Sequence, residues 1–380
     1  MSETSLIQRV NFLKGKYDEA IKMNNKSGLK CLENDLLTFE EFQRDDIILG
    51  VLKDIQNMIE SNKSLHLENS IQLTNSKDNN LIISIFDIPY APSMGIDACF
   101  YINAVIDPEI YKYKTNANPI FLKEWTTGFD PEHMVAIFPE NHIGVTATSK
   151  DKIFYLVNKF AWRHFHTTQK IISRCVESNS LKSLRSTTYS DIEDAVVYWV
   201  YLHEYHHQEQ GNLRIPEYLS LKSSKVLAGL EELRVDIGSM LLCLKQGKKF
   251  KRNNFYLFEF ILSERLLRYG VDGVKLNKNN VLVPSYDALS SYMFYNLLIE
   301  RNGISIINNQ ISIEENIVEI LEEIYNEINT VELQAKNSID NMAKSILTDY
   351  TSQCLSIDNA LKYTSHPFYD LMREQVAYQI

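Results

Sequence analysis

The chain has 380 residues, of which 44% are hydrophobic and 23% are charged, and its formal net charge at pH 7 is −10. This length can bury a large core and is enough for two lobes, and the composition is that of a soluble globular protein. The negative charge argues against a nucleic-acid partner, which would be held through its phosphates. No apolar run approaches the roughly 18–20 residues that span a bilayer, so no membrane partner is expected.

The N-terminal segment and the cysteines indicate the compartment. The opening MSETSLIQRVNFLKGK lacks the apolar core and the small-residue cleavage site of a secretory signal. The five cysteines are scattered, odd in number and without a C-x-x-C pair, so they predict reduced and mostly buried thiols instead of a disulfide framework. These features predict a cytoplasmic protein, and they leave its oligomeric state open.

The N-terminal half is predicted to hold helices followed by a sheet. Residues 1 to about 62 place apolar side chains at helical spacing, and the polar, asparagine-rich residues 64–80 predict a loop. Short runs rich in β-branched and aromatic residues then predict four or five strands of one small mixed or antiparallel sheet. These runs are Leu81–Ile88, Ala98–Ile106, Met134–Phe138, Ile143–Thr148 and Ile153–Val157.

After Phe160 the pattern is helical almost throughout. The exception is Gly303–Ile313, where the Asn308-Asn309 pair predicts a small hairpin. Helices are predicted at about 191–210, 225–245, 255–269, 285–300, 313–349 and 366–378. The predicted fold class is therefore α+β and predominantly helical. We expect residues 1–180 to form a lobe from the N-terminal helical segment and the sheet, and residues 181–380 to form a helical catalytic lobe that carries two motifs.

The segment His203-Glu204-Tyr205-His206-His207 reads H-E-x-x-H and is the most informative feature of the chain. On a helix, residues four apart project from one face, so His203 and His207 can reach one Zn²⁺. Glu204 lies beside them, where it can remove a proton from water bound to the metal. His206 leaves the helix about 100° from His207, so a polar or supporting role is expected for it.

The residues before the motif indicate a helix of about 20 residues. Asp191–Leu202 (DIEDAVVYWVYL) begins with acidic residues and continues as a dense apolar run, with Ser190 as the predicted N-cap and Gly211 as the predicted end. The histidines share a face with Trp199, so that face is predicted to point inward. The alternative is a pair of buried histidines without a metal, which would leave Glu204 as an unexplained carboxylate beside a buried face.

A second predicted helix, Lys225–Lys245, follows a polar connection and supplies candidate carboxylates. Glu232 and Asp236 are four apart, so one can bind the metal while the other hydrogen-bonds a ligand imidazole. Glu231 points about 100° away from Glu232, so only one of the two can align with the histidine pair. The alternative for this EELRVD segment is a solvated charged stripe. Apolar residues flank it on almost every side, which indicates a buried helix whose carboxylates need a cation or strong donors.

An H-E-x-x-H motif followed some two dozen residues later by a helix with E-x-x-x-D resembles the gluzincin clan of zinc metallopeptidases. The segment Glu231–Asp236 is most similar to the E-E-C-R-A-E/D motif of the dipeptidyl peptidase III family. The resemblance covers about 50 residues, Asp191–Cys243. That family has a six-residue H-E-x-x-G-H segment and a much longer chain, so the resemblance supports the site and does not extend to dipeptidyl specificity.

The resemblance implies a site with three metal ligands, one base and two supporting carboxylates. These are His203, His207 and Glu232 as ligands of one Zn²⁺ per chain, Glu204 as the general base, and Glu231 and Asp236 as partners of the two histidines. In enzymes of this kind an edge strand lines a cleft between two lobes and pairs with the substrate backbone. One of the strands between residues 134 and 157 is the candidate for that role.

The function predicted first is a zinc-dependent hydrolase that cleaves an amide bond, most simply a peptidase acting on a small peptide or a biosynthetic intermediate. A carboxylate-bridged di-iron oxidase is an alternative because Glu204-x-x-His207 also reads E-x-x-H, but the second E-x-x-H that it requires is absent from the sequence. A non-catalytic binding protein with a peptidase fold is the other alternative. The same ligands could hold Mn, Co or Fe, and 21 tyrosines leave the oxyanion donor unassigned.

Overall fold

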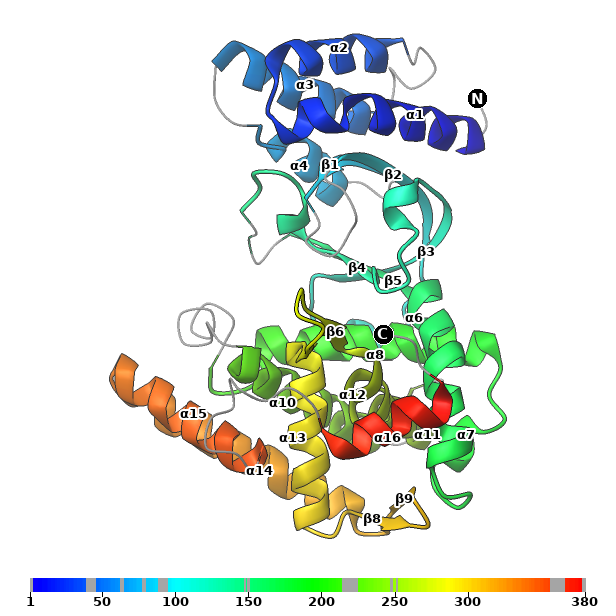
Figure 1. Cartoon of the computed structure of the whole chain (residues 1–380), viewed down its shortest axis with the longest axis vertical. Coiled ribbons are helices and arrows are strands. Elements are labelled where there is room, and N and C mark those ends of the chain that lie inside the picture. The colour runs from blue at the N-terminus through cyan, green and yellow to red at the C-terminus, as the bar shows by residue number, and fades with distance from the viewer. Residues whose placement is uncertain are drawn as a thin grey trace. The chain divides into compact units, whose positions relative to one another are not determined.

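The computed structural model describes residues 3–38, 46–61, 65–76, 80–87, 95–146, 148, 151–213, 225–246, 249–250, 252–355 and 366–377. The chain divides into two compact units, which can be followed by colour in Figure 1. The sheet unit comprises Met1–Val105 and Asn116–Phe160, and the helical unit comprises Ile106–Thr115 and Ala161–Ile380. The predicted α+β, predominantly helical class is confirmed. The lobe boundary predicted at residue 180 stays a prediction.

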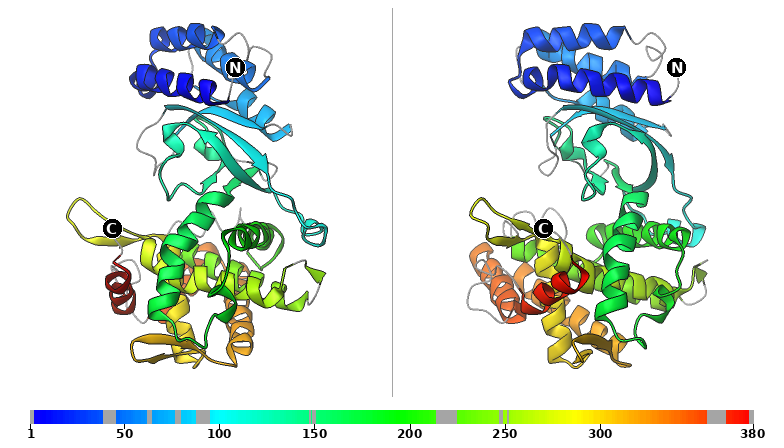
Figure 2. Two further views of the ribbon diagram at one scale, coloured as in Figure 1. Left: turned by 90° about the vertical axis from the view of Figure 1, so that its right-hand side faces the viewer. Right: turned by 45° about the vertical axis from the view of Figure 1, so that its right-hand side comes forward.

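Four helices of the sheet unit lie on one face of its sheet, as Figure 2 shows. They are α1 (Glu3–Lys22), α2 (Lys26–Leu37), α3 (Asp46–Ser61) and α4 (Glu68–Ser76). Apolar side chains from the inner sides of the helices form one core with the sheet, including Val10, Leu29, Val51, Ile83 and Ile85.

Helix α4 lies inside residues 64–80, so the loop predicted there is wrong for these residues. The backbone N–H groups of Asn69 and Ser70 donate to Asp54, which is buried on α3. A helix needs such acceptors at its N-terminus. Here the acceptor comes from another helix, and a local sequence pattern does not reveal it.

The five strands form one mixed sheet with the order β1-β2-β3-β5-β4. They are β1 (Leu81–Phe86), β2 (Gly95–Asn103), β3 (Ala117–Trp125), β5 (Ile153–Leu156) and β4 (Ala136–Ile137). Strands β3 and β5 are parallel, and the other neighbours are antiparallel. Two short turns, η1 (Thr127–Phe129) and η2 (Pro139–Asn141), flank β4 in the chain. After η2 the chain returns to β1, where the N–H of Ile143 donates to the carbonyl of Ile85 at 3.1 Å, so the sheet curls.

One predicted strand is wrong, and one strand of the structure is not predicted. The pattern misses β3, because Pro119 interrupts the run and a proline within a run argues against a strand. The strand predicted at Ile143–Thr148 begins instead with a turn at 143–144 and is irregular over its other described residues. Gly144 has φ +74°, and a Cβ there would lie 2.5 Å from the carbonyl oxygen of Leu65, so the turn requires glycine.

The helical unit is built around α10 (Lys225–Lys245), which is buried along most of its length. Its neighbours are α8 (Tyr189–Glu209), α11 (Asn254–Ser263), α13 (Tyr286–Glu300) and α14 (Ile317–Lys336). A helix that is apolar almost all round belongs inside a bundle, and α10 has that composition. The charged residues in the middle of α10 therefore face other helices, whereas Lys225 and Lys245 at its ends are exposed.

Two long helices each contain a π-helical turn, and both turns belong to the helical unit. One runs from α6 (Val157–Arg163) through η3 (His164–Thr168) into α7 (Gln169–Cys175). The other runs from α11 through η6 (Glu264–Arg268) into α12 (Tyr269–Asp272). The two turns lie against each other, and Nδ1 of His164 is 2.7 Å from Oε1 of Glu264. Turns of this kind occur often at functional sites.

Short helices and hairpins complete the helical unit. They are α5 (Pro108–Tyr111), η4 (Lys182–Leu184), the pair β6 (Val274–Leu276) and β7 (Leu282–Pro284), the pair β8 (Ile304–Ile307) and β9 (Gln310–Ile313), α15 (Asp340–Leu355) and α16 (Pro367–Val376). The β8–β9 hairpin confirms the prediction for 303–313, whereas β6–β7 is not predicted. The single helix predicted at 313–349 is wrong, because α14 ends at Lys336 and α15 begins at Asp340. Within the described residues, no helix is long and apolar enough to cross a membrane.

Candidate active site

Helix α8 carries the H-E-x-x-H motif and begins with a capping box. Oγ1 of Thr188 accepts from the N–H of Asp191 at 3.2 Å, and Oδ2 of Asp191 accepts from the N–H of Thr188 at 2.9 Å. Thr188 is therefore the N-cap, and the predicted N-cap Ser190 lies in the first turn instead. The helix ends at Glu209, just before Gly211, whose φ is +92°.

The EELRVD segment of α10 is not a solvated stripe. Arg234 and Asp236 are fully buried, and the side chains of Glu231 and Glu232 are only 12% and 18% exposed. Buried charges require paired or hydrogen-bonded partners. The histidines of α8 supply some of these partners, because α8 packs directly against α10.

Three side chains from α8 and α10 converge on one point. The Nε2 atoms of His203 and His207 are 3.0 Å apart. Glu232 places Oε2 at 3.3 Å from Nε2 of His203 and Oε1 at 3.6 Å from Nε2 of His207. Among the residues that the structure describes, these three form the one group of His, Cys, Asp and Glu side chains that could hold a metal ion.

The spacing of these atoms fits a zinc ion. With bonds of roughly 2.0–2.2 Å in a tetrahedral site, ligand atoms lie about 3.3–3.6 Å apart. The separations found here, 3.0 Å between the imidazoles and 3.3 and 3.6 Å from them to the two different oxygens of Glu232, are close to that range. Two imidazoles and one carboxylate are a ligand set of catalytic zinc sites, in which a fourth position stays open.

Carboxylates hold the outer nitrogens of both imidazoles. Nδ1 of His203 is 2.8 Å from Oδ1 of Asp236, and Nδ1 of His207 is 3.0 Å from Oε1 of Glu231. Trp199 also donates to Oδ1 of Asp236, at 2.8 Å. Such bonds set the ring orientation and favour the tautomer with its proton on Nδ1, so that the two Nε2 atoms face each other.

Burial and neighbouring charges shift the pKa values of these side chains in opposite directions. Burial raises the pKa of Asp236, but the charges of Arg265 and His203 outweigh it and hold this pKa below its usual range. Burial also raises the pKa of Glu232, but the hydrogen bond to His203 and the positive charges of His203 and His207 outweigh burial and lower this pKa. Burial would lower the pKa of His203, but Asp236 and Glu232 raise it well above its ordinary value.

Arg265 joins this group although the motifs do not indicate it. It is fully buried in η6, and its Nε donates to Oδ2 of Asp236 at 2.6 Å. Its Nη1 donates to Oδ1 of Asp287 at 3.0 Å, and its Nη2 donates to Oε2 of Glu232 at 3.4 Å. Burial, opposed by Arg265 and assisted by Glu232, raises the pKa of Asp287 to about 6. The available sequence signal is Ser263-Glu264-Arg265, a polar interruption in an otherwise apolar helix.

Glu204 lies on the same helix as the histidines and is 5% exposed. Its Oε2 accepts from Nε2 of Gln208 at 3.3 Å. It is not a member of the group of three that could hold a metal. Glu204 therefore follows His203 in the chain, and its carboxylate lies outside the group of three candidate ligands.

The surroundings of His206 differ from the polar or supporting role expected for it. The side chain is buried, and neither ring nitrogen has a hydrogen-bond partner among the described residues. The ring packs against Gly238 of α10, where a Cβ would lie 2.6 Å from both Nδ1 and Cε1 of His206. Burial, followed by the charge of Arg234, lowers the pKa of His206 to about 3. His206 is thus a neutral packing residue where α8 contacts α10 at Gly238.

Comparisons with known proteins show a likeness of fold. No protein-family model matches the chain, and no curated protein matches its sequence. The solved structure of dipeptidyl peptidase III from Caldithrix abyssi is similar, with 14% identity, a TM-score of 0.61, and coverage of 93% of this chain and 69% of that one. Dipeptidyl-peptidase III from Corallococcus sp. strain EGB is also similar, with 11% identity, a TM-score of 0.54, and coverage of 93% and 71%. The chain therefore has a dipeptidyl peptidase III-like fold.

Proposed function

We propose that this protein is a zinc-dependent, peptidase-like hydrolase that cleaves an amide bond in a small peptide or another small amide. The observation that supports it most is the convergence of two imidazole nitrogens and one carboxylate. The Nδ1 atom of each imidazole is also within hydrogen-bond distance of a further carboxylate. The similar solved structures, which carry the name dipeptidyl peptidase III, agree with this reading.

The proposed ligands of one zinc ion are His203, His207 and Glu232. When bound there, zinc would act as a Lewis acid that polarises the scissile carbonyl and lowers the pKa of water. Asp236 and Glu231 hold the two imidazoles in the orientation that ligation needs, through their bonds to the Nδ1 atoms.

Glu204 is the proposed general base. It takes a proton from the attacking water while the water oxygen bonds to the carbonyl carbon. It then gives this proton to the leaving nitrogen as the C–N bond breaks. One water is thereby added across the amide bond, and Glu204 returns to its ionised form.

The proposed partner is a small peptide, and the predicted cytoplasmic location stays a prediction. The di-iron alternative gains no support, because within the described residues no second group of candidate ligands accompanies His203, His207 and Glu232. The acidic chain also gives no reason to expect a nucleic-acid substrate.

Elemental analysis combined with a peptide-library screen tests this proposal. Full-length protein prepared without chelators should hold about one zinc per chain. It should also cleave library peptides in a reaction that 1,10-phenanthroline stops and added zinc restores. The variants His203→Ala and His207→Ala should lose the metal. Wild-type protein with almost no metal would overturn the site, and a zinc-loaded protein that cleaves no peptide or amide would overturn the hydrolase.

A further inference from the structure

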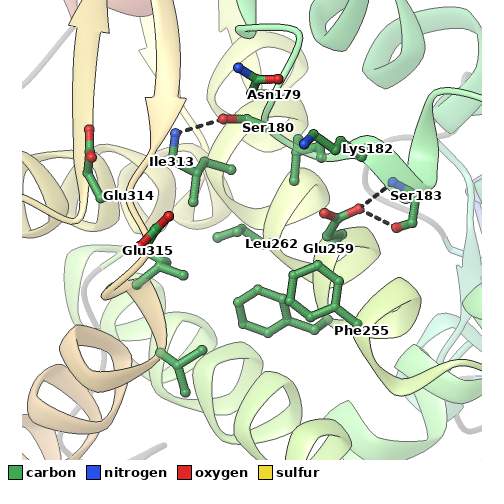
Figure 3. A pocket seen from close by; sticks show the side chains of 14 residues that line it. Asn179, Ser180, Lys182, Ser183, Phe255, Glu259, Leu262, Ile313, Glu314 and Glu315 are labelled. Carbon is green, nitrogen blue, oxygen red and sulfur yellow. Dashed lines mark hydrogen bonds between the residues drawn. The ribbon is translucent and has the colours of Figure 1, made fainter.

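A cavity of about 560 Å³ lies in the helical unit, and it shares no residue with the proposed zinc site (Figure 3). Its walls come from residues 179–183, α11, residues 313–315 and the start of α14. Phe255, Phe258 and Leu262 form an apolar side of it. Half of its lining residues are apolar and half are polar, and a cavity of this size that combines apolar surface with placed polar groups can hold a small molecule.

Glu259 of α11 is the polar group that distinguishes this cavity. The residue is only 5% exposed, and its Oε2 accepts from both the backbone N–H, at 2.9 Å, and the hydroxyl of Ser183. Figure 3 shows both of these bonds on one carboxylate oxygen. The other oxygen, Oε1, has no hydrogen-bond or ion-pair partner among the described residues. A buried carboxylate therefore presents one unpaired oxygen to the cavity.

Other buried carboxylates of the helical unit are neutralised differently. Three of them meet the guanidinium of an arginine: Asp236 with Arg265, Glu264 with Arg268, and Glu332 with Arg234. Within the described part of the chain, Glu259 has no such cation. The free oxygen of Glu259 is therefore open to an ion pair with a cation that enters the cavity from outside.

The rest of the cavity wall also favours a positive ligand. Glu314 and Glu315 line the side across from Glu259 in Figure 3, and Lys182 is the one basic residue among the lining residues. Three carboxylates and one ammonium give the wall a net charge of −2. Oε1 of Glu314 accepts from Ser305 at 2.6 Å, so this carboxylate is held in place. Charge complementarity of this kind selects partners by sign.

We propose that this cavity binds a small organic ammonium ion with an apolar body, such as an arylalkylamine. Its ammonium group would meet Oε1 of Glu259, and its apolar body would lie against Phe255, Phe258 and Leu262. This inference goes beyond the proposed function and does not depend on it, because binding at this cavity needs neither the metal nor hydrolysis.

Three probes of nearly equal shape and different charge test the proposal: 2-phenylethylammonium, 2-phenylethanol and 3-phenylpropionate. Ligand-observed NMR titrations of the full-length protein should give a millimolar dissociation constant for the cation. The neutral alcohol should bind at least tenfold more weakly, and the anion should not bind. Equal binding of cation and alcohol would show an apolar pocket without charge recognition and would overturn the proposal, as would the absence of cation binding.

Two variants and one control locate the bound amine. In Glu259→Gln the amide oxygen can still accept from Ser183, while an NH₂ replaces the free oxygen, so the cation should bind at least tenfold more weakly and the alcohol as before. Glu315→Lys, at an exposed position of the wall, should also weaken binding of the cation. This second variant tests the proposal if Glu259→Gln fails to fold. Glu322→Gln on the exposed side of α14 removes the same charge away from the cavity and should change nothing. Cation binding that survives both cavity variants would place the amine elsewhere and overturn the proposal.

Discussion

Nε of Arg265 donates to Oδ2 of Asp236 at 2.6 Å, and the other oxygen of Asp236 lies 2.8 Å from Nδ1 of His203. A buried arginine in a π-helical turn is therefore one carboxylate away from a proposed zinc ligand. The same guanidinium reaches Glu232 and Asp287, so three carboxylates share one positive charge. Loss of that charge would leave buried carboxylates unpaired and would release the imidazole that Asp236 holds.

We therefore expect Arg265→Gln to lower both stability and metal affinity. Removing one partner of a buried ion pair costs about 3–5 kcal/mol of unfolding free energy. Urea unfolding of the zinc-free protein would measure this loss. Zinc affinity, measured by competition with a chelator, should fall about 10- to 100-fold. The control is Arg301→Gln, whose partner Glu327 is 41% exposed, and it should cost less than about 1 kcal/mol. Similar small losses in the two variants would show that Arg265 is not part of the site.

The two motif-bearing helices could be predicted from sequence because their information is local. The spacing of His203 and His207 fixes a shared helical face, and the apolar residues around Glu232 indicate that its helix is buried. Arg265 could not be assigned in the same way. It reaches Asp236 from a separate helix, and the π-helical turn that carries it packs against η3, a segment about 100 residues earlier in the chain. A single sequence does not show which distant residues come into contact, so Arg265 could not be paired with Asp236 in advance.

The fold shows the same division between local and distant information. Strand β1 and the β8–β9 hairpin follow from local composition, and the structure contains both. Helix α4 depends on Asp54 of another helix for its N-terminal acceptors, and β3 contains Pro119. In both cases tertiary partners override what the local pattern favours.

Glu204→Gln should retain the fold and the metal while losing most of its turnover. The substitution keeps the shape of the side chain and removes the base, and general-base catalysis contributes about 10²–10⁴-fold. The measurements are zinc content, thermal unfolding and the rate of cleavage of any peptide found by the library screen. Glu209→Gln, at the exposed end of the same helix, is the matched control and should keep its activity. Full activity in Glu204→Gln would remove the proposed mechanism.

Gly238→Ala should destabilise the contact between α8 and α10. Alanine favours a helix over glycine by about 1 kcal/mol, but its Cβ would lie 2.6 Å from the buried ring of His206. Overpacking of this kind costs about 1–3 kcal/mol, so a net loss of stability is expected. In the double variant His206→Ala with Gly238→Ala the clash with the His206 ring is absent, and only the close contact with Cε2 of Tyr325, at 3.0 Å, remains. Urea unfolding of the single and double variants should therefore give a favourable coupling energy, and additive losses would show that the ring moves aside freely.

The sheet unit should lose stability in mild acid because of His142. Its ring is buried, with Nδ1 2.7 Å from Oγ of Ser84, and burial lowers its pKa from 6.5 to about 4. Between pH 6.5 and pH 4 the unfolded state binds a proton at His142 more readily than the folded state does. The contribution of the neutral His142 ring to the free energy of unfolding is therefore complete above pH 6.5. It is lost as the pH falls toward 4, by about 3 kcal/mol in all. Unfolding free energies from pH 7 to pH 4 should fall less steeply in His142→Gln. Ser84→Ala should lower stability while retaining the pH dependence of the wild type, and identical pH profiles for His142→Gln and wild type would contradict the assignment.

The adjacent acids Glu231 and Glu232 should contribute unequally to metal binding. Glu232 places its oxygens 3.3 and 3.6 Å from the two Nε2 atoms, whereas Glu231 bonds to Nδ1 of His207 on the outer side of the ring. Loss of a ligand removes one of only three protein bonds to the ion, so Glu232→Gln should weaken zinc binding by more than about 100-fold. Loss of a carboxylate behind a ligand imidazole typically costs about 10- to 100-fold, and Glu231→Gln should fall in that range. The two variants remove the same charge from neighbouring positions of one helix, so each controls for the other. Chelator competition on both proteins distinguishes the roles, and a larger loss in Glu231→Gln would reverse the assignment of the third ligand.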